Sequence, residues 1–235
     1  MRVLAIDIGN TSVHFGLFEG KTMVREWRVA SAGLKKIPAD LEADRVVVAS
    51  VVPRLNTVVR KRFPAAVFAG RRNIGLKVRV KRPAEVGADR LVDALAAAEL
   101  YGGPAIIVDF GTATTFDDIN GRAEYLGGAI APGLLLARDT LHERTAKLPK
   151  ISLQAPVSVI GRDTVSALRS GLVFGYAALV EGMVGRIKSK LKSKNSKLKV
   201  IATGGLARLI CKQTRVIDII DDKLTLKGLR LLAAK

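Results

Sequence analysis

The chain has 235 residues, of which 49% are hydrophobic and 26% are charged, as in an ordinary folded protein. This composition excludes a disordered tail, a collagen-like chain and a small disulfide scaffold. Lys and Arg outnumber Asp and Glu by 39 to 21, which leaves a formal net charge of +18 at pH 7. The excess predicts attraction to anions, whether nucleotides, phosphorylated substrates, nucleic acid or an acidic membrane surface.

Composition also bears on location and metal binding. The longest uncharged stretch, residues 125–137, is shorter than the roughly 20 apolar residues of a membrane-spanning helix. Asp7 interrupts the first apolar run, so we expect no signal peptide. A single cysteine, Cys211, makes no internal disulfide and favours a reducing, cytoplasmic setting. One cysteine and two histidines nearly exclude a zinc site of the usual kind.

The first half of the chain alternates predicted strands and helices. Four segments have the apolar or alternating pattern of strands: residues 3–8, 13–18, 23–29 and 45–52. Pro53 begins a basic segment that we expect to be helical as far as Phe63. An Ala- and Leu-rich helix is predicted over residues 88–101, where Gly102 and Gly103 end it. This alternation predicts an α/β fold.

The second half begins with a copy of the first. Residues 105–112 and residues 4–10 each combine an apolar strand, an Asp, one apolar residue, a Gly and a small polar residue. Another strand-like segment follows each copy, and Asn120-Gly121 marks a hairpin turn in the second. We therefore predict an internal duplication into residues 1–103 and 104–235, with a linker near residues 102–105 and a cleft between the halves.

The remainder of the second half is predicted to be mixed. Residues 151–161 contain proline and are expected to be irregular, and a long helix is expected over residues 164–191, with Asp163 or Thr164 as its N-cap. Three shorter elements follow: a strand over 198–203, a helix from Leu206, and a final helical turn or two over 227–235.

Three glycine turns follow predicted strands, and such turns can present backbone N–H groups to phosphate. They are Asp7-Ile8-Gly9-Asn10-Thr11, Asp109-Phe110-Gly111-Thr112 and Thr203-Gly204-Gly205. The carboxylates of the first two could hold Mg²⁺ or a water that bridges nucleotide phosphates. An isolated Asp beside Gly more often only closes a turn. Equivalent positions in two duplicated halves favour nucleotide binding instead.

A fourth motif, Gly87-Ala88-Asp89-Arg90, stands at the start of the Ala-rich helix. Asp89 there could accept a hydroxyl proton and Arg90 could bind a carboxylate. The alternative is that Asp89 only favours the helix dipole and Arg90 is a solvated surface residue. The glycine-rich P-loop motif and the dinucleotide-binding motif are both absent, which excludes a P-loop kinase and argues against a dinucleotide fold.

Taken together, these segments resemble the type III pantothenate kinases, members of the actin, sugar-kinase and Hsp70-like ATPase superfamily. The matching segments are Asp7-Ile-Gly-Asn-Thr11, Gly87-Ala-Asp-Arg90, Asp109-Phe-Gly-Thr-Ala-Thr-Thr115, Tyr125-Leu-Gly-Gly-Ala-Ile-Ala-Pro-Gly133, Gly161-Arg-Asp-Thr164 and Thr203-Gly-Gly205. They occur in the family's order. The resemblance implies two duplicated actin-like (ribonuclease H-like) βββαβαβα halves around a central cleft.

The resemblance also implies an activity: ATP-dependent phosphorylation of the terminal hydroxyl of pantothenate to 4'-phosphopantothenate, the first step of coenzyme A biosynthesis. It implies Mg²⁺, a monovalent cation (K⁺ or NH₄⁺) and a cytoplasmic homodimer.

The family's functional residues fall on matching positions of this chain. By resemblance, Asp89 is the general base, and Gly87, Ala88, Asp89 and Arg90 surround pantothenate together with Thr164. Thr112 contacts ATP, Asp109 binds the monovalent cation, and Asp7 lies near Mg²⁺. The first phosphate loop comprises Asp7, Ile8, Gly9, Asn10, Thr11, Ser12, Val13 and His14. Family members often carry a substrate-contacting Tyr where this chain has Val80.

The basic segments leave a second interpretation open. Residues 186–199 hold seven Lys or Arg and no acid, and residues 71–82 hold six more basic residues. We favour a solvated helix end and loop, since aromatic residues are only 5% of the chain and single-strand stacking has little support. The alternatives are a regulatory, nucleic-acid-binding protein resembling the Bvg accessory factors, with Val80 marking lost substrate binding, or a kinase for another small alcohol.

Overall fold

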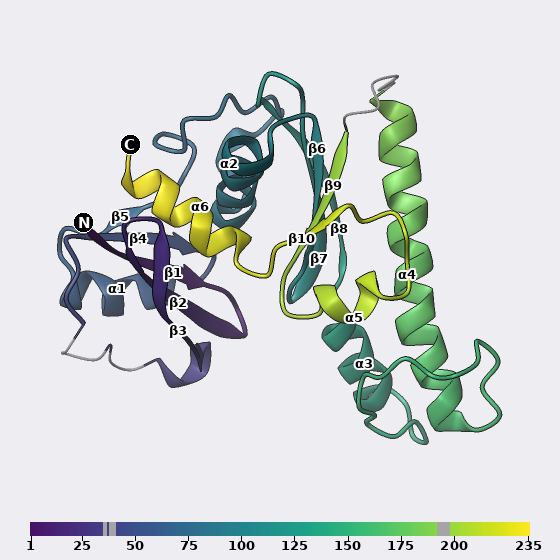
Figure 1. The fold of residues 1–235 in the computed structure, drawn as a ribbon. Helices are drawn as coiled ribbons and strands as arrows, with labels where there is room; N and C mark the ends of the chain where they lie inside the picture. The colour runs from purple at the N-terminus through teal and green to yellow at the C-terminus, as the bar shows by residue number, and fades with distance from the viewer. Residues whose placement is uncertain (35–36, 38–40, 192–197) are drawn as a thin grey trace. The chain divides into compact units, whose positions relative to one another are not determined.

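The computed structural model describes residues 1–34, 37, 41–191 and 198–235 (Figure 1). The chain divides into two compact units. The first unit comprises Met1–Gly102, Ile119–Gly127 and Lys223–Lys235, and the second comprises Gly103–Asp118 and Gly128–Asp222. The break after Gly102 lies within the linker expected near residues 102–105. The predicted halves put Ile119–Gly127 and Lys223–Lys235 in the second half, because both segments follow the linker in sequence. The structure has them in the first unit.

Each half contributes one five-stranded sheet (Figure 1). The first sheet has the order β3-β2-β1-β4-β5, from β1 (Arg2–Ile8), β2 (Ser12–Glu19), β3 (Thr22–Ala30), β4 (Arg45–Ser50) and β5 (Val67–Phe68). The second has the order β8-β7-β6-β9-β10, from β6 (Ala105–Phe110), β7 (Ala113–Ile119), β8 (Tyr125–Pro132), β9 (Lys199–Thr203) and β10 (Ile219–Ile220). Counted within its own half, each sheet has the strand order 3-2-1-4-5. The identical order confirms the predicted duplication and the α/β fold class.

The two aspartates of the duplicated turns occupy matching positions in their sheets. Strand β1 is parallel to β4, with Asp7 opposite Ala49. Strand β6 is parallel to β9, with Asp109 opposite Thr203. Each Asp therefore lies at the carboxyl end of the first strand of its half, beside the end of the fourth strand. The carboxyl ends of parallel strands are where ligands bind in open α/β sheets.

In the part of the chain that the structure describes, six α-helices and two short 3₁₀ helices accompany the strands. They are η1 (Ser31–Gly33), α1 (Pro53–Arg62), η2 (Pro83–Glu85), α2 (Ala88–Tyr101), α3 (Leu134–Glu143), α4 (Thr164–Lys190), α5 (Ala207–Cys211) and α6 (Leu224–Ala233). The helices predicted at 53–63, 88–101 and 164–191 are confirmed. Between β3 and β4, the described residues show η1 where the family pattern implied a helix. Helix α3 was not predicted, because its leucines directly follow a glycine-rich segment.

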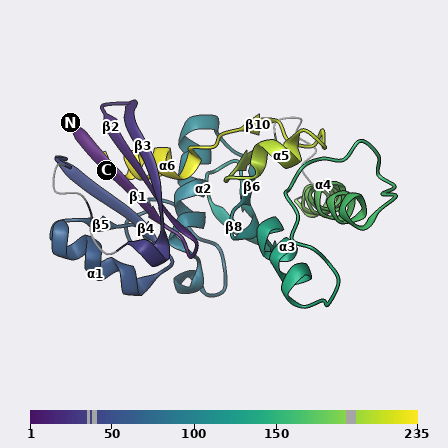
Figure 2. The ribbon, with the colours of Figure 1, turned by 90° about the horizontal axis from the view of Figure 1, so that it is seen from below.

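The C-terminal helix α6 belongs to the first unit because it packs on the first sheet and on α2 (Figures 1 and 2). Gly228 allows the close approach, since a β-carbon there would lie 2.5 Å from the carbonyl oxygen of Val92. Leu226 packs against Gly16 of β2 in the same way. The opposite face of this sheet buries an apolar cluster that includes Ile6 and, from α1, Val59. Gly16 thus lets α6 approach one face of the sheet closely, and α1 packs against the apolar cluster on the other face.

Helix α4 is the central helix of the second unit's core. Asp163 caps it as predicted, since its Oδ1 accepts a hydrogen bond of 2.9 Å from the Ser166 N–H and Ser166 bonds back to the Asp163 N–H. Val173, Val180 and other residues of α4 are buried in the apolar cluster beside β6 and β9. By length and composition alone, α4 could cross a membrane. A buried core helix meets the same criterion, so this is weak evidence for a membrane span.

Candidate active site

The first phosphate loop is held in shape by its own backbone and by a serine from β3's end. The Gly9 N–H donates to the Ser12 carbonyl at 3.0 Å. The Ser31 hydroxyl donates to the Gly9 carbonyl at 2.6 Å, and the Ser31 N–H donates to the Thr11 carbonyl at 3.0 Å. Ser31 is buried, 2% exposed, while Asn10 and Thr11 are exposed. The loop is therefore braced from behind and open on its other side, as a phosphate-binding turn requires.

Three residues expected in this loop have their side chains inside the protein. Ile8 and Val13 are fully buried in the core cluster of the first unit. His14 lies directly opposite Asp7 on the neighbouring strand, and its Nε2 is 2.7 Å from Oε1 of Glu26. Burial lowers the pKa of His14 below its ordinary value, against the raising effect of the hydrogen bond with Glu26. Any contribution of these three residues to nucleotide binding is through the backbone or through support of the loop.

The acceptor motif stands at the N-terminus of α2. Gly87 is the N-cap of this helix, and Asp89 and Arg90 lie in its first turn. The Arg90 N–H donates a hydrogen bond of 2.8 Å to Asp89 Oδ1. Burial raises the pKa of the Asp89 carboxyl above its ordinary value, against the lowering effect of the Arg90 N–H and charge. A raised pKa makes a carboxylate a stronger base, as the role of general base requires.

Gly87 makes room for that carboxylate. A β-carbon at Gly87 would lie 2.4 Å from Asp89 Oδ1 and 3.6 Å from Val51 Cγ1. Val51 follows β4, and its N–H donates to the Ile8 carbonyl at 3.1 Å. Within the first unit, Val51 therefore contacts both the acceptor motif and the end of the strand that carries Asp7.

In the second unit, two of the three glycine turns pack directly on each other. Gly204 has a φ of +90°, and a β-carbon there would lie 2.3 Å from Asp109 Oδ1 and 2.7 Å from the Phe110 backbone. Gly111 is also close to the Asp109 carboxylate. The carboxylate is thus surrounded by backbone, which suits a group that shares a small cation with carbonyl oxygens.

The Thr112 turn meets the start of helix α3. A β-carbon at Gly133, the N-cap of α3, would lie 2.0 Å from the Thr112 carbonyl oxygen. The Tyr176 hydroxyl of α4 donates to the Pro132 carbonyl at 2.9 Å, which fixes the residue before Gly133. The α3 N-terminus is therefore held beside Thr112, and N–H groups at a helix N-terminus attract phosphate.

Two further residues expected to contact substrate, Thr164 and Val80, belong to other segments of the chain. Thr164 is the first residue of α4 and is exposed; with residues of α3 and α4, such as Leu141 and Leu168, it lines a pocket of about 450 Å³. Val80 lies in the loop before the acceptor motif, where its Cγ1 would be 3.3 Å from a β-carbon on Gly127. Gly127 has a φ of +111°, which favours glycine.

The family model described as type III pantothenate kinase matches residues 3–186, including Asp7, Asp89 and Asp109. The chain belongs to the type III pantothenate kinase family. It is 44% identical to the type III pantothenate kinase of Dehalococcoides mccartyi strain CBDB1, over 98% of this chain and 95% of that protein. The resemblance noted in the sequence is confirmed.

Solved structures show the same fold at lower identity. A conserved putative Baf family transcriptional activator from Campylobacter jejuni superposes with a TM-score of 0.68 at 19% identity, over 98% of this chain and 97% of that chain. A putative 2-dehydro-3-deoxygalactonokinase from Sinorhizobium meliloti superposes with a TM-score of 0.57 at 13% identity, over 98% and 95%. At these identities the two structures bear on the fold alone.

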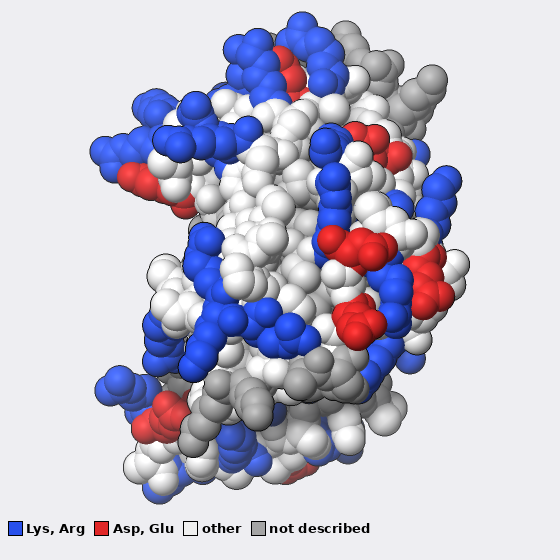
Figure 3. Space-filling view, turned by 90° about the vertical axis from the view of Figure 1, so that its left-hand side faces the viewer, with Lys and Arg blue, Asp and Glu red and all other residues white. Residues whose placement is uncertain are grey.

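Figure 3 shows one face of the molecule with the charged side chains coloured by sign. Lys and Arg side chains lie there in several groups with uncharged surface between them, and some lie beside carboxylates. Of the basic run at 186–199, Arg186, Lys188 and Lys190 belong to the end of α4. Lys192, Lys194 and Lys197 lie outside the described residues.

Two residues that support the kinase family motifs were missed by the sequence reasoning. Ser31 is separated from the phosphate loop by two strands, and a lone serine after a strand gives no signal. Tyr176 lies in the middle of α4, and an aromatic residue in an apolar helix predicts only packing.

Proposed function

We propose that this protein transfers the terminal phosphoryl group of ATP to the terminal hydroxyl of pantothenate, in the cytoplasm. The observation that carries this proposal is the half-buried Asp89 carboxylate, held at the start of α2 within a family match that spans residues 3–186. No other carboxylate of the acceptor motif competes for the role of general base. Arg90, its neighbour, is suited to bind the carboxylate of pantothenate.

The other roles follow from the two duplicated turns. The loop of residues 9–12 and Thr112 would bind ATP through backbone N–H groups and hydroxyls. Asp7 would hold Mg²⁺ and Asp109 a monovalent cation, since carboxylate and carbonyl oxygens are the ligands that hard cations prefer. When bound, Mg²⁺ would supply neutralisation of the charge on the phosphates.

The reaction would require only two things of the acceptor motif: uptake of a proton and alignment of the hydroxyl oxygen. The hydroxyl of pantothenate has a pKa far above 7, so its proton must leave as the bond to phosphorus forms. Asp89 would accept that proton late in the step, and Arg90 would hold the acceptor so that its oxygen is aligned. Most of the rate enhancement in phosphoryl transfer comes from such alignment and from charge stabilisation.

The proposal predicts that ATP consumption depends on pantothenate. A coupled assay of ADP release should show little turnover with ATP and Mg²⁺ alone, turnover when pantothenate is added, and more turnover with K⁺ or NH₄⁺ than with Na⁺. Turnover with another small alcohol but not with pantothenate would contradict the proposed substrate, and would be consistent with Val80 at the family's Tyr position. Duplex DNA binding that falls steeply with salt, without any kinase activity, would favour the regulatory alternative.

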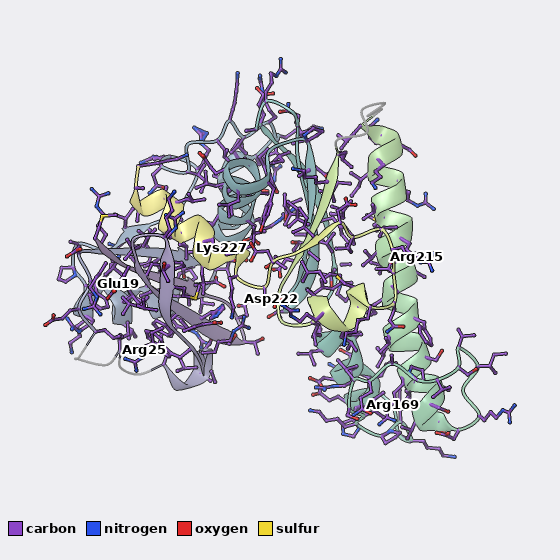
Figure 4. The ribbon with its side chains drawn as sticks, viewed as in Figure 1. Glu19, Arg25, Arg169, Arg215, Asp222 and Lys227 are labelled. Atoms are coloured by element: carbon purple, nitrogen blue, oxygen red, sulfur yellow. The ribbon has the colours of Figure 1, made fainter. Side chains whose placement is uncertain are left out.

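We also propose that the protein is a homodimer that forms through its second unit. Exposed apolar side chains are found there on β8, on α3 and in the irregular segment 151–161: Ile130, Leu135, Leu136, Val157, Val159 and Ile160. Arg169 of α4 ties this segment to the helix, because its Nη2 donates to Ser152 Oγ at 2.9 Å (Figure 4). Apolar residues held in place in this way are typical of an interface.

The dimer proposal predicts that charges in this segment separate the subunits. The double variant Val159→Asp/Ile160→Asp should sediment as a monomer at concentrations where the wild type is a dimer, since each exposed carboxylate would be desolvated in the interface. Val24→Asp on β3, which replaces another exposed apolar residue, is the control and should leave the dimer intact. A monomeric wild type would refute the proposal.

A further inference from the structure

The loop that leads into the acceptor motif is long and has little secondary structure of its own. Between β5 and Gly87, residues 69–86 contain only the short helix η2 and an isolated bridge at Val78. Loops of this length in a compact unit are usually functional, and something must order them. Several of the contacts that order this one come from the β7–β8 hairpin, residues 120–127, which belong to the same unit.

Glu124 is the centre of those contacts. Its Oε1 accepts two hydrogen bonds from Arg79, from Nε at 3.2 Å and Nη2 at 2.8 Å, and Lys77 Nζ is 3.9 Å away. Its Oε2 accepts from Asn120 Nδ2 at 2.7 Å and from Arg122 Nη2 at 3.2 Å. The Glu124 side chain is only 10% exposed, whereas Arg79 is 46% exposed. A largely buried carboxylate therefore holds two basic residues of the loop.

The hairpin turn is built so that Glu124 points at the loop. Asn120 Oδ1 accepts from the N–H groups of Arg122 and Glu124, at 2.9 and 3.0 Å. Ala123 has a φ of +56°, which closes the turn tightly. The side-chain amide of Asn120 then fixes the Glu124 carboxylate itself.

Backbone contacts continue the same interaction toward Val80. The Arg79 N–H donates to the Tyr125 carbonyl at 2.8 Å, and the Tyr125 N–H donates to the Lys77 carbonyl at 2.9 Å. Tyr125 is fully buried. The glycine at 127 leaves space for Val80. The middle of the loop is thus paired with the hairpin over four residues, 77–80, immediately before the chain turns to the acceptor motif.

We propose that Glu124 is a positioning residue for the acceptor substrate: through Arg79 it fixes the loop 69–86 and so the place of the Gly87–Arg90 motif. This inference rests on the proposed function of that motif. Glu124 itself would contact neither the substrate nor the reacting atoms. An exposed ion pair on the same loop, Arg82 with Glu85, is 78% and 66% exposed and is too solvated to have this effect.

The charge of Glu124 persists across the working range of pH. Hydrogen bonds from Asn120 and Arg79 lower the pKa of this carboxyl to about 2. Because the folded-state pKa is below the ordinary value, its contribution to stability is present above pH 4.5 and is lost only as the pH falls toward 2. The effect of removing the charge should therefore be the same from pH 6 to pH 9.

The test is Glu124→Gln, with Glu85→Gln as the matched control. In Glu124→Gln we expect kcat/KM for pantothenate to fall about tenfold, since small misplacements far from the chemistry can cost up to about 10²-fold. KM for ATP should stay within about twofold, and amide hydrogen exchange of residues 69–86 should accelerate. Glu85→Gln should change none of these. Unchanged pantothenate kinetics together with unchanged exchange would overturn the proposal, as would an equal rise in both KM values.

A double-mutant cycle tests whether Glu124 and Arg79 act through one shared interaction. Arg79→Met keeps the side-chain stem and removes the guanidinium, so it should reproduce the loss seen in Glu124→Gln. The double variant should be no worse than either single one, because both remove one interaction. Additive losses would overturn the proposal. The exchange measurement does not depend on activity, so a wild type inactive with pantothenate would refute the proposed function while leaving the positioning role to be judged from exchange.

Discussion

Asp89→Asn should reduce turnover with pantothenate by at least about a hundredfold, because a positioned general base contributes about 10²–10⁴-fold. Asn keeps the size of the side chain and the acceptor oxygen for the Arg90 N–H, which donates to Asp89 Oδ1 at 2.8 Å. It removes only the ability to take up a proton. The measurement is steady-state turnover at saturating ATP and pantothenate.

The same variant should not be less stable at pH 7. Burial raises the pKa of Asp89, so the folded state disfavours its charged form. A group whose folded-state pKa is raised contributes stability below its unfolded pKa, and that contribution is lost as the pH rises through the folded-state pKa. At pH 7 Asp89 is therefore a cost to folding, which Asn relieves. Thermal unfolding at pH 7 should show an equal or higher midpoint for Asp89→Asn.

Two controls make this result interpretable. Binding of a non-hydrolysable ATP analogue, measured by calorimetry, should be close to wild type, since the phosphate loops are untouched. Asp93→Asn, one helical turn further along α2, replaces a buried carboxylate that has no proposed role as base. It should affect stability more than turnover. If Asp89→Asn retains more than a tenth of wild-type turnover, Asp89 is not the general base.

Much of the fold could be read from local pattern. The ends of α2 were predictable because Asp89 and Gly102 are strong start and stop signals for a helix. The duplication was predictable because Asp7 and Asp109 follow apolar runs of the same length. Both signals are local in sequence, and local preference agrees with the final fold at these positions.

Other features depend on contacts between distant residues and gave no such signal. The return of α6 to the first sheet rests on Gly228 fitting against Val92, more than a hundred residues earlier. Neither residue is distinctive by itself. The segment Ile119–Gly127 belongs to the first unit through Glu124 and Arg79, which are 45 residues apart. A lone acid in a hairpin turn predicts only solubility.

In the candidate site too, some residues could be predicted from the sequence and others could not. Residue types with a recognisable chemistry, such as Asp89 with Arg90, could be singled out from spacing and from the family resemblance. Their supports could not, because Ser31 and Tyr176 are ordinary polar residues whose role depends on where the chain brings them. Sequence also assigned Ile8, Val13 and His14 to a binding loop by continuity, although they lie on β1 and β2, which are covered on both faces, so that their side chains are in the interior.

We expect Gly204→Ala to disrupt the turn Thr203-Gly204-Gly205 of the second unit. Gly204 has a φ of +90°, which costs a residue with a β-carbon about 1–3 kcal/mol. The added carbon would also meet Asp109 Oδ1 at 2.3 Å and the Phe110 backbone at 2.7 Å. Overpacking of this kind typically costs a further 1–3 kcal/mol or so. The backbone cannot yield easily, because Asp109 and Thr203 are paired in adjacent parallel strands.

The expected result is a midpoint of thermal unfolding lowered by about 5–20 °C, at roughly 2–4 °C for each kcal/mol in a protein of this size. The clash falls on the Asp109 carboxylate, the proposed ligand of the monovalent cation. The variant molecules that remain folded should therefore need a higher K⁺ concentration for half-maximal turnover. Gly171→Ala in α4 is the control: no atom lies within 4 Å of its β-carbon, and Ala favours a helix, so stability should be equal or slightly higher. A Gly204→Ala enzyme with wild-type stability and wild-type K⁺ dependence would mean that this turn has room to move, and that the packing of Gly204 against Asp109 does not hold the carboxylate in place.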